Sequence, residues 1–288
     1  MPELPEVETI RRGLEKRLID QAIISFENLS PKQVVGDSER LTGRTVEAIR
    51  RQGKLLIIEF RDSNFVVTIH LKMTGQLVWL AKGGDEQVAG GHPEKSYLET
   101  MPGRHTRAIV RFDDGSTLYF NDMRRFGRVT LVEKSELARI PFLQSLGPEP
   151  PSNNFTVFYL SQRLQKKPRT NIKSFLLDQT NIAGIGNIYA DESLFRAAIL
   201  PNRLAVSLST GEVRNLFDAI QETLELALMH GGSTSRDYLN TDGEAGTFLR
   251  IANVYHRTGQ GCNRCGTGII ERIKLGGRST HFCRNCQR

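Results

Sequence analysis

Cysteine is absent from the first 261 residues of this 288-residue chain, and no apolar run approaches the roughly 20 residues that a helix needs to cross a bilayer. The N-terminal stretch is acidic and interrupted by charges, which excludes a secretory signal peptide. With 39% hydrophobic residues, the chain has enough apolar side chains for two globular domains. We therefore expect an ordered, intracellular protein.

Net positive charge is absent from most of the chain as well. The formal charge is +7, but residues 250–288 carry eight lysines and arginines against one glutamate, so residues 1–249 are balanced. A basic segment on a neutral protein is typical of a surface that meets a polyanion, because neutralised phosphates release counterions. A solvated basic tail has the same composition, so charge alone leaves both interpretations open.

All four cysteines lie in the last 27 residues, as two Cys-x-x-Cys turns separated by 17 residues: Cys262, Cys265, Cys283 and Cys286. Two such turns can supply four thiolates to the closed tetrahedral site that structural zinc prefers. The alternative, two disulfides or a redox pair, is disfavoured in an intracellular chain without other cysteines. We expect one structural zinc ion that folds this module and takes no part in catalysis.

The spacer between the two cysteine pairs predicts a hairpin. Its residues form two short β-rich runs around Gly276-Gly277, which is the pattern of a zinc ribbon. The tip of this hairpin carries Lys274 and Arg278, which can reach a phosphate. The nearby histidines, His256 and His281, are not expected to bind the metal.

The first half of the chain combines an opening helix with β-rich runs. Apolar residues at Val7, Ile10, Leu14 and Leu18 follow a helical spacing, and glutamates occupy the first turn, where the helix dipole favours anions. Runs rich in β-branched residues follow at 55–60, 65–71, 107–112, 116–120 and 127–132. We expect a β-sandwich or barrel with flanking helices, and a flexible loop over the glycine-rich residues 83–91.

The second half is predicted to be helical up to the cysteine module. Helical patterns cover about 154–165, 172–180, 187–198 and 210–229, followed by a loop at 231–246. The turn at 181–187 has glycines whose amides, with the next helix N-terminus, can hold a phosphate, although such a turn often only packs two helices. The expected domains are residues 1–146, a linker at 147–153, a helical domain at 154–249 and the zinc module at 250–288.

Four segments together resemble the formamidopyrimidine-DNA glycosylase family: PELPEVETIRRGL at 2–14, NDMRRFG at 121–127, QTNIAGIGNIYADESLF at 179–195, and the terminal cysteine module. The resemblance covers essentially the whole chain. It implies an α+β enzyme with an N-terminal β-sandwich, a helix–two-turn–helix motif and a zinc finger. Such an enzyme removes oxidised purines from duplex DNA and then cleaves the abasic strand.

The resemblance implies that Pro2, Glu3, Lys54 and Arg278 are catalytic. Removal of the initiator methionine exposes the amine of Pro2, and an α-amino group with a pKa near roughly 8 is partly neutral at pH 7. This amine attacks the sugar and forms an iminium ion, which permits strand cleavage by successive eliminations. Glu3 shuttles protons, and Glu6 belongs to the same pocket. Complementarity to the helix dipole is the alternative explanation for both glutamates.

The resemblance also implies a set of DNA-contacting residues: Met73, His105, Arg124, Phe126, Lys173, Asn187 and Arg278. An extruded base leaves a gap, which Met73 fills while Phe126 wedges the stack and Arg124 meets the orphaned cytosine. Asn187 and Arg278 hold backbone phosphates and bend the strand, and the loop at 231–246 closes over the base. Taken singly, the methionine and the phenylalanine are more typical of a core.

The expected partner is damaged double-stranded DNA, bound by a monomer in the cytoplasm at the nucleoid, without a membrane or a small-molecule cofactor. Met123 departs from the family motif, where proline is usual, so opposite-base preference stays open. An endonuclease VIII-type enzyme for oxidised pyrimidines is the nearest alternative, although Leu4 and the Arg124 to Phe126 segment favour purines. A non-catalytic damaged-DNA-binding protein is the alternative from another class.

Overall fold

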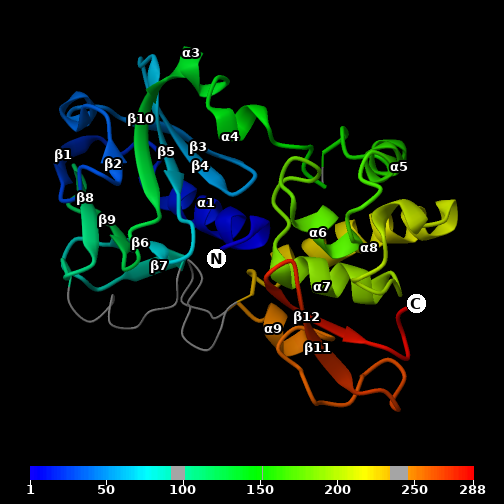
Figure 1. The fold of residues 1–288 in the computed structure, drawn as a ribbon. Coiled ribbons are helices and arrows are strands. Elements are labelled where there is room, and N and C mark those ends of the chain that lie inside the picture. Colours follow the sequence, from blue (N-terminus) through cyan, green and yellow to red (C-terminus); the bar gives the residue numbers. More distant parts are fainter. Residues whose placement is uncertain (92–100, 151, 234–245) are drawn as a thin grey trace. The chain divides into compact units, whose positions relative to one another are not determined.

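The computed structural model describes residues 1–91, 101–150, 152–233 and 246–288. The chain forms two compact units, one with Met1–Gln144 and one with Ser145–Ser233 and Thr247–Arg288. Figure 1 shows the elements of both units in chain order. Among the helices in the described ranges, none combines the length and hydropathy that a membrane span requires.

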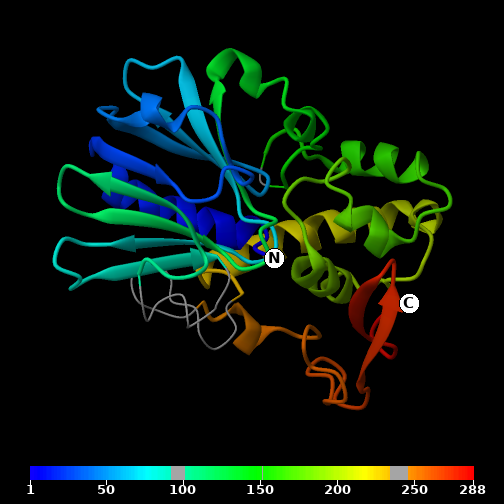
Figure 2. The ribbon, with the colours of Figure 1, turned by 60° about the vertical axis from the view of Figure 1, so that its left-hand side comes forward.

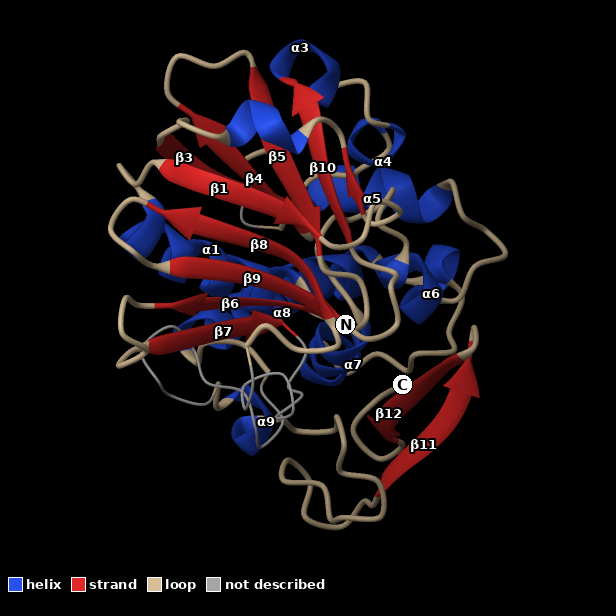
Figure 3. Cartoon of the chain, turned by 90° about the vertical axis from the view of Figure 1, so that its left-hand side faces the viewer, coloured by secondary structure: helices blue, strands red, loops and turns tan. Residues whose placement is uncertain are grey.

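Two five-stranded sheets form the first unit, and Figure 3 shows them as two layers. The strand order of one sheet is β1 (Ile23–Asn28), β8 (Thr106–Phe112), β9 (Thr117–Asp122), β6 (Gly75–Leu80) and β7 (Gln87–Gly91). The strand order of the other is β2 (Val34–Val35), β10 (Arg128–Glu133), β5 (Phe65–His70), β4 (Leu55–Phe60) and β3 (Val46–Gln52). Side chains from both sheets share one apolar core, so the unit is a β-sandwich.

Helix α1 (Leu4–Leu18) closes this sandwich along one side. It packs against β3 and β7, which are edge strands of different sheets. Val7, Ile10, Leu14 and Leu18 are all buried in the sandwich core, at the predicted spacing. The short 3-10 helix η1 (Ser38–Leu41) packs against β1 at the other edge. The start of α1 is therefore anchored by the same apolar stripe that completes the core.

The β-rich runs fall on strands as predicted, but the sequence reading was incomplete. The predicted loop at 83–91 is wrong over Gln87–Gly91, which form β7 in an antiparallel ladder with β6. Gly91 has a φ of 125° and lies so close to Gly75 that a Cβ would meet its carbonyl oxygen at 2.3 Å. Glycine is required here because the two strands approach closely. Composition alone does not distinguish such a glycine from a glycine in a flexible loop.

The second unit is a helical bundle that includes the cysteine hairpin. Its main helices are α5 (Val157–Gln165), α6 (Ile172–Leu177), α7 (Asn187–Arg196) and α8 (Thr210–Met229), followed by the short α9 (Phe248–Ile251). Strands β11 (Ile270–Leu275) and β12 (Arg278–Cys283) pair around Gly276 and Gly277, whose φ angles of 55° and 76° suit a type I′ turn. Helix α7 packs on α8, α6 and β12. Figure 2 shows this hairpin in red.

Remaining elements are short. The first unit ends with α3 (Lys134–Leu137) and α4 (Pro141–Gln144), and the 3-10 helix η2 (Ala205–Ser207) lies between α7 and α8. Helices α6 and α7 end earlier than predicted, at Leu177 and Arg196. Most of the loop predicted at 231–246 lies outside the described residues.

The segment predicted as a linker is packed where the structure describes it. Gly147 donates its N–H to Gln179 O at 2.9 Å, and Ala183 donates to Pro148 O at 3.1 Å. A Cβ at Gly147 would lie 2.4 Å from Asn181 O, so this glycine allows a close backbone approach. The second unit begins at Ser145, and the domain boundaries drawn from the sequence stay predictions.

Candidate active site and nucleic-acid interface

The chain enters α1 through a capping box. Glu3 is the N-cap residue, and its backbone N–H donates to Glu6 Oε2 at 2.7 Å. Pro2, Glu3 and Glu6 are buried, whereas Met1 is 53% exposed. Both carboxylates therefore lie at the positive end of the helix dipole, next to the residue whose amine is the predicted nucleophile. Glu6 has a structural task at this position whether or not it also serves catalysis.

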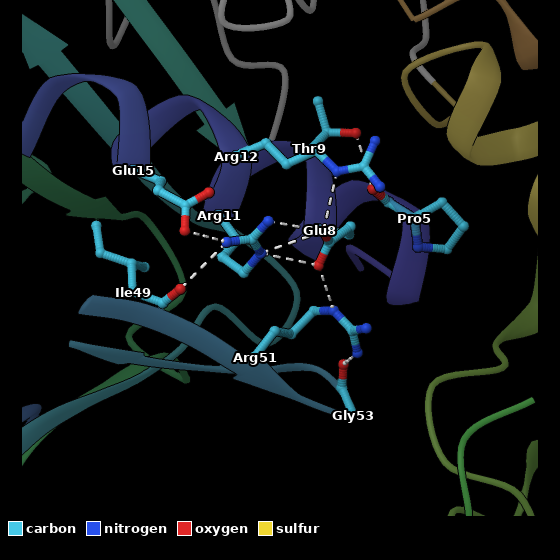
Figure 4. A network of polar contacts seen from close by, with 9 residues as sticks. All are labelled: Pro5, Glu8, Thr9, Arg11, Arg12, Glu15, Ile49, Arg51 and Gly53. Carbon is cyan, nitrogen blue, oxygen red and sulfur yellow. Dashed lines mark hydrogen bonds and ion pairs between the residues drawn. The ribbon is translucent and has the colours of Figure 1, made fainter. Parts of the chain in front are cut away.

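One turn further along α1, Glu8 joins the helix to β3 (Figure 4). Its carboxylate accepts hydrogen bonds of 3.0 to 3.1 Å from Arg11, Arg12 and Arg51. Arg51 also donates from Nη1 to Gly53 O at 2.9 Å. Burial by itself raises the pKa of Glu8, but the hydrogen bonds from the three arginines outweigh burial and lower that pKa. The network thus connects α1 to the turn that leads into β4.

That turn presents Lys54, which is only 4% exposed. The positive charge of Lys54 acts on His70, which ends β5. Burial is the largest cause that lowers the pKa of His70 to about 3, and the charges of Lys72 and Lys54 lower it further. His70 Nδ1 accepts a hydrogen bond from Lys72 N at 3.1 Å, so the ring is neutral and carries its proton on Nε2. The sequence reasoning missed His70, because a histidine ending an apolar strand is usually a packed core residue.

The three predicted wedge residues meet at the surface of the first unit. Met73 lies in the turn between β5 and β6, and Arg124 and Phe126 lie in the loop between β9 and β10. The guanidinium of Arg124 is 4.9 Å from the centre of the Phe126 ring, and its Nη1 is 3.4 Å from Met73 Sδ. Met73 is 39% exposed and Phe126 is 51% exposed, so two large apolar side chains meet solvent on either side of one guanidinium. We call these three residues the wedge cluster.

His105 lies directly before β8 and is half-buried. Its Nε2 accepts a hydrogen bond from Arg104 Nε at 2.8 Å. The backbone carbonyl of His105 accepts from Asp122 N at 2.9 Å, so the residue is tied to the end of β9. Its contact with DNA stays a prediction.

In the second unit, α6 and α7 are joined by a braced turn. Gln179 Nε2 donates to Leu177 O at 3.0 Å and to Ile185 O at 2.8 Å, while its Oε1 accepts from Gly184 N at 2.9 Å. The turn delivers the chain to Asn187, the first residue of α7. The first N–H groups of a helix have no partner within it, so this end is suited to an anion.

Lys173, one of the predicted DNA-contacting residues, is buried in α6. Its side chain is 0% exposed; Nζ lies 2.6 Å from Asp191 Oδ1 and donates to Ser279 O at 2.9 Å. Asp191 Oδ2 in turn accepts from His281 N at 2.9 Å. The prediction that Lys173 binds DNA stays a prediction, since in this structure its fully buried ammonium does not meet the surface where a phosphate would lie. Instead it joins α6, α7 and β12.

Strand β12 brings the two predicted phosphate ligands, Asn187 and Arg278, together. Asn187 Nδ2 donates to Ser279 O at 3.0 Å, and Arg278, the preceding residue, is exposed at the start of β12. The predicted hairpin tip is confirmed, since Lys274 and Arg278 flank it on β11 and β12. These contacts keep Arg278 beside the N-terminus of α7.

The four cysteine sulfurs form one cluster, with every Sγ within 4.8 Å of the others. Two of the separations are 3.6 Å, between Cys262 and Cys286, and 3.9 Å, between Cys265 and Cys283. A tetrahedral zinc ion with bonds of about 2.3 Å requires sulfurs about 3.8 Å apart, so the set fits zinc. All four cysteines are free thiols, which contradicts the disulfide alternative.

The backbone around Cys265 favours its thiolate, whereas burial raises the pKa of Cys283 and of Cys286. The N–H groups of Gly268 and Thr267 lower the pKa of Cys265 to about 6. A Cβ at Gly268 would lie 2.7 Å from Cys283 Sγ, so a side chain there would displace a ligand. His281 Nδ1 is hydrogen-bonded to Asp191 Oδ2, and the ring of His256 packs against Tyr255. Neither histidine belongs to the cluster of metal ligands.

Three family models match the chain in the order of the sequence. They describe the formamidopyrimidine-DNA glycosylase N-terminal domain at residues 1–129, the formamidopyrimidine-DNA glycosylase H2TH domain at 146–238, and a zinc finger found in FPG and IleRS at 259–288. A formamidopyrimidine-DNA glycosylase from Geobacillus kaustophilus is 42% identical over 294 residues, which is 100% of both chains. The Pediococcus pentosaceus protein of the same name is 40% identical over 100% of this chain and 99% of its own.

The chain belongs to the formamidopyrimidine-DNA glycosylase family.

Solved structures agree with this family fold. A Lactococcus lactis protein in complex with a Fapy-dG containing DNA is 36% identical, covers 100% of both chains and superposes with a TM-score of 0.87. A complex of the Lactococcus lactis protein with an abasic site containing DNA has the same TM-score, at 35% identity and 99% coverage of both chains. The α+β class, the sandwich, the helical domain and the terminal zinc finger predicted for this glycosylase family member are confirmed.

Proposed function

We propose that this protein is a base excision repair enzyme that removes oxidised purines, including 8-oxoguanine and formamidopyrimidines, from duplex DNA and then nicks the abasic strand. The observation that carries the proposal is the buried Pro2–Glu3 pair at the head of α1, in a chain that matches the glycosylase family over its full length. The Lactococcus lactis structures with Fapy-dG and abasic-site DNA support the choice of substrate.

The nucleophile is the amine that Pro2 carries once Met1 is removed. Met1 is 53% exposed, so the bond before Pro2 is open to processing. Burial and the positive end of the α1 dipole disfavour a charged ammonium, whereas the neighbouring carboxylates of Glu3 and Glu6 favour it. The first two effects increase the fraction of neutral amine whose lone pair can attack C1′ of the damaged nucleoside.

The reaction uses that amine twice. The new N–C1′ bond replaces the bond to the base, which leaves with a proton, and opening of the sugar yields an iminium ion. The iminium withdraws electrons, so loss of a C2′ proton expels the 3′ phosphate, and a second elimination expels the 5′ phosphate. Glu3, next in the chain, gives and takes the protons of these steps.

The second unit binds the phosphates of the DNA backbone. Asn187 at the start of α7 and Arg278 on β12 act on phosphates, and Lys173 supports them from inside. The zinc ion, when bound by the four cysteines, holds the hairpin that carries Arg278. We place the enzyme in the cytoplasm, at the nucleoid, where duplex DNA is found.

Borohydride trapping tests the proposal. The processed protein is mixed with duplexes that contain 8-oxoguanine opposite cytosine, 5-hydroxyuracil, or no damage, and reduced adducts are mapped by mass spectrometry. We expect an adduct on Pro2 that forms preferentially with 8-oxoguanine. Preference for 5-hydroxyuracil would assign the protein to oxidised pyrimidines, and binding without any adduct would make it a non-catalytic DNA-binding protein.

The variants Pro2→Gly and Glu3→Gln sharpen this test. Both should lose base excision while they keep their affinity for DNA, because neither change touches the phosphate-binding residues of the second unit. Full activity of Pro2→Gly would refute the amine mechanism.

A further inference from the structure

The chain crosses between the two sheets of the sandwich twice at one place. Strands β5 and β10 pair in one sheet and β6 and β9 pair in the other, so the β5–β6 turn and the β9–β10 loop leave neighbouring strand ends. The ladders bring His70 opposite Arg128 and Gly75 opposite Asp122. These two connections carry the wedge cluster, Met73 on one and Arg124 and Phe126 on the other.

Asp122 is the buried centre of this crossing. Its side chain is 0% exposed, and its carboxylate accepts from Gly127 N at 2.7 Å, from Gln33 Nε2 at 2.9 Å and from the hydroxyl of Thr74. Gly127 admits this contact because it has no side chain: a Cβ there would lie 3.0 Å from Asp122 Oδ2. The carboxylate therefore fixes both ends of the β9–β10 loop, at positions 122 and 127.

Thr74 links that loop to the other connection. Its hydroxyl donates to Asp122 Oδ1 and accepts from the backbone N–H of Arg124 at 3.0 Å. Thr74 is 4% exposed and directly follows Met73. One buried hydroxyl thus sets the position of the Arg124 backbone relative to the turn that carries Met73. Buried networks of this kind are rigid when all members are satisfied.

Each connection also contains a non-glycine residue in the left-handed region. Lys72 has a φ of 52° and Arg125 has a φ of 58°. Such conformations are uncommon for side chains of this size and persist where the surroundings hold them. The two connections are therefore shaped by their buried contacts, although their tips are exposed.

We propose that Thr74 and Asp122 are positioning residues that align Met73 with Arg124, and that this alignment sets how strongly the enzyme prefers cytosine opposite the lesion. The inference rests on the proposed function, in which Arg124 meets the orphaned base and Met73 fills the gap. Recognition of a base edge requires a donor placed to within a fraction of an ångström, and misplacement of about 1 Å can cost orders of magnitude in rate.

Thr74→Val is the decisive variant, because valine keeps the shape of threonine and removes both hydrogen bonds. Thr74→Ser restores the hydroxyl and serves as rescue. Thr68→Val is the matched control: Thr68 is also 4% exposed and donates to a backbone carbonyl, Thr130 O at 3.3 Å, but lies in the middle of β5. Single-turnover excision of 8-oxoguanine is measured opposite cytosine and opposite adenine, together with melting temperatures.

We expect Thr74→Val to slow excision opposite cytosine by about ten-fold and to move the cytosine-to-adenine rate ratio towards one. Thr74→Ser and Thr68→Val should keep the wild-type ratio. An unchanged ratio in folded Thr74→Val would overturn the inference. If that variant does not fold, Asp122→Asn replaces it: an amide has one acceptor oxygen for three donors, so the ratio should fall there as well, and an unchanged ratio refutes the inference.

Trapping on a preformed abasic site separates this inference from the function on which it rests. The abasic substrate has no damaged base to extrude or excise, so the wild-type enzyme and every folded variant should still form the Pro2 adduct. Absence of that adduct in the wild-type enzyme would refute the proposed function itself. A normal adduct with an unchanged base ratio in Thr74→Val would refute only the positioning role.

Discussion

His70 shows how a single buried residue is controlled by charges from neighbouring elements. Lys72 follows it in the chain and Lys54 comes from the β3–β4 turn, and together with burial they hold the pKa of His70 at about 3. The ring packs edge-on against Phe142, 5.4 Å between centres. A histidine in this setting stays neutral throughout the physiological range.

This pKa predicts a pH dependence of stability. The unfolded chain takes up a proton on His70 near pH 6.5, whereas the folded protein does so only near pH 3. The unfolded state therefore binds more protons in this window, and the free energy of unfolding falls as the pH falls. We expect wild type to lose about 1.4 kcal/mol per pH unit more than His70→Gln between pH 6 and pH 4 in urea denaturation. Parallel curves would refute the assignment.

Lys173 is the second residue whose role depends on its surroundings. Loss of its charge leaves Asp191 buried without its cation, so Lys173→Gln should lower the free energy of unfolding by about 3 kcal/mol. Lys167→Gln is the control, because Lys167 and Asp178 form a partly exposed pair worth about 1 kcal/mol or less. Chemical denaturation measures both.

Salt titrations decide whether Lys173 touches DNA. A lysine on a phosphate contributes about 0.9 to the slope of log affinity against log salt concentration. We expect Lys173→Gln to keep the wild-type slope and Arg278→Ala, whose side chain is exposed, to reduce it by about 1. A reduced slope in Lys173→Gln would show that Lys173 contacts a DNA phosphate directly.

At the scale of elements, α1 and the β3–β4 turn are held together by one guanidinium. Arg51 is 10% exposed and binds Glu8 through Nε and Gly53 O through Nη1, a planar fork that the shorter, point-like ammonium of a lysine does not reproduce. Arg51→Lys should therefore cost about 1 kcal/mol of stability, measured by chemical denaturation. Arg50→Lys is the control, since Arg50 is 69% exposed and pairs only at the surface with Glu59. Equal behaviour of the two variants would contradict this view.

Element prediction succeeded where the period was strong. The apolar stripe of α1 matches its helix because the stripe lies on one face, which the core covers. The run at 55–60 matches its strand because a short, continuous apolar run is typical of a buried strand. Element prediction failed for β7 and missed β3 and β6, whose pairing depends on partners distant in sequence. The brace of Gln179 across its turn was equally invisible, because a glutamine side chain carries no pattern.

At the scale of the whole molecule, the zinc finger is the part with the smallest core. Its apolar cluster combines cysteines with Phe195, Val254 and Ile270, too few side chains to fold a segment of this size alone. Zinc removal by a chelator, or Cys262→Ser, should therefore unfold β11 and β12 and weaken DNA binding by more than ten-fold, about 1.4 kcal/mol or more.

Zinc content, DNA affinity and circular dichroism measured on one sample test this prediction. The β-sandwich has a core of its own and should remain folded, so most of the β signal should persist. Arg272→Lys is a suitable control in the same hairpin, because it keeps the positive charge and Arg272 is an exposed residue and not a metal ligand. DNA affinity that survives complete loss of zinc would refute the structural role of the metal.

The sequence by itself determined the features that depend on local spacing: the cysteine pairs, the α1 stripe, the β-rich runs and the family motifs. The family resemblance assigned a set of residues to the candidate site, and these assignments stay predictions: Pro2, Glu3, Lys54, Met73, His105, Arg124, Phe126, Lys173, Asn187 and Arg278. Only the tertiary structure showed that Lys173 is buried, that His70 is kept neutral, and that Thr74 and Asp122 join two connections. Burial and hydrogen bonding depend on which distant segments meet, and no local period records that.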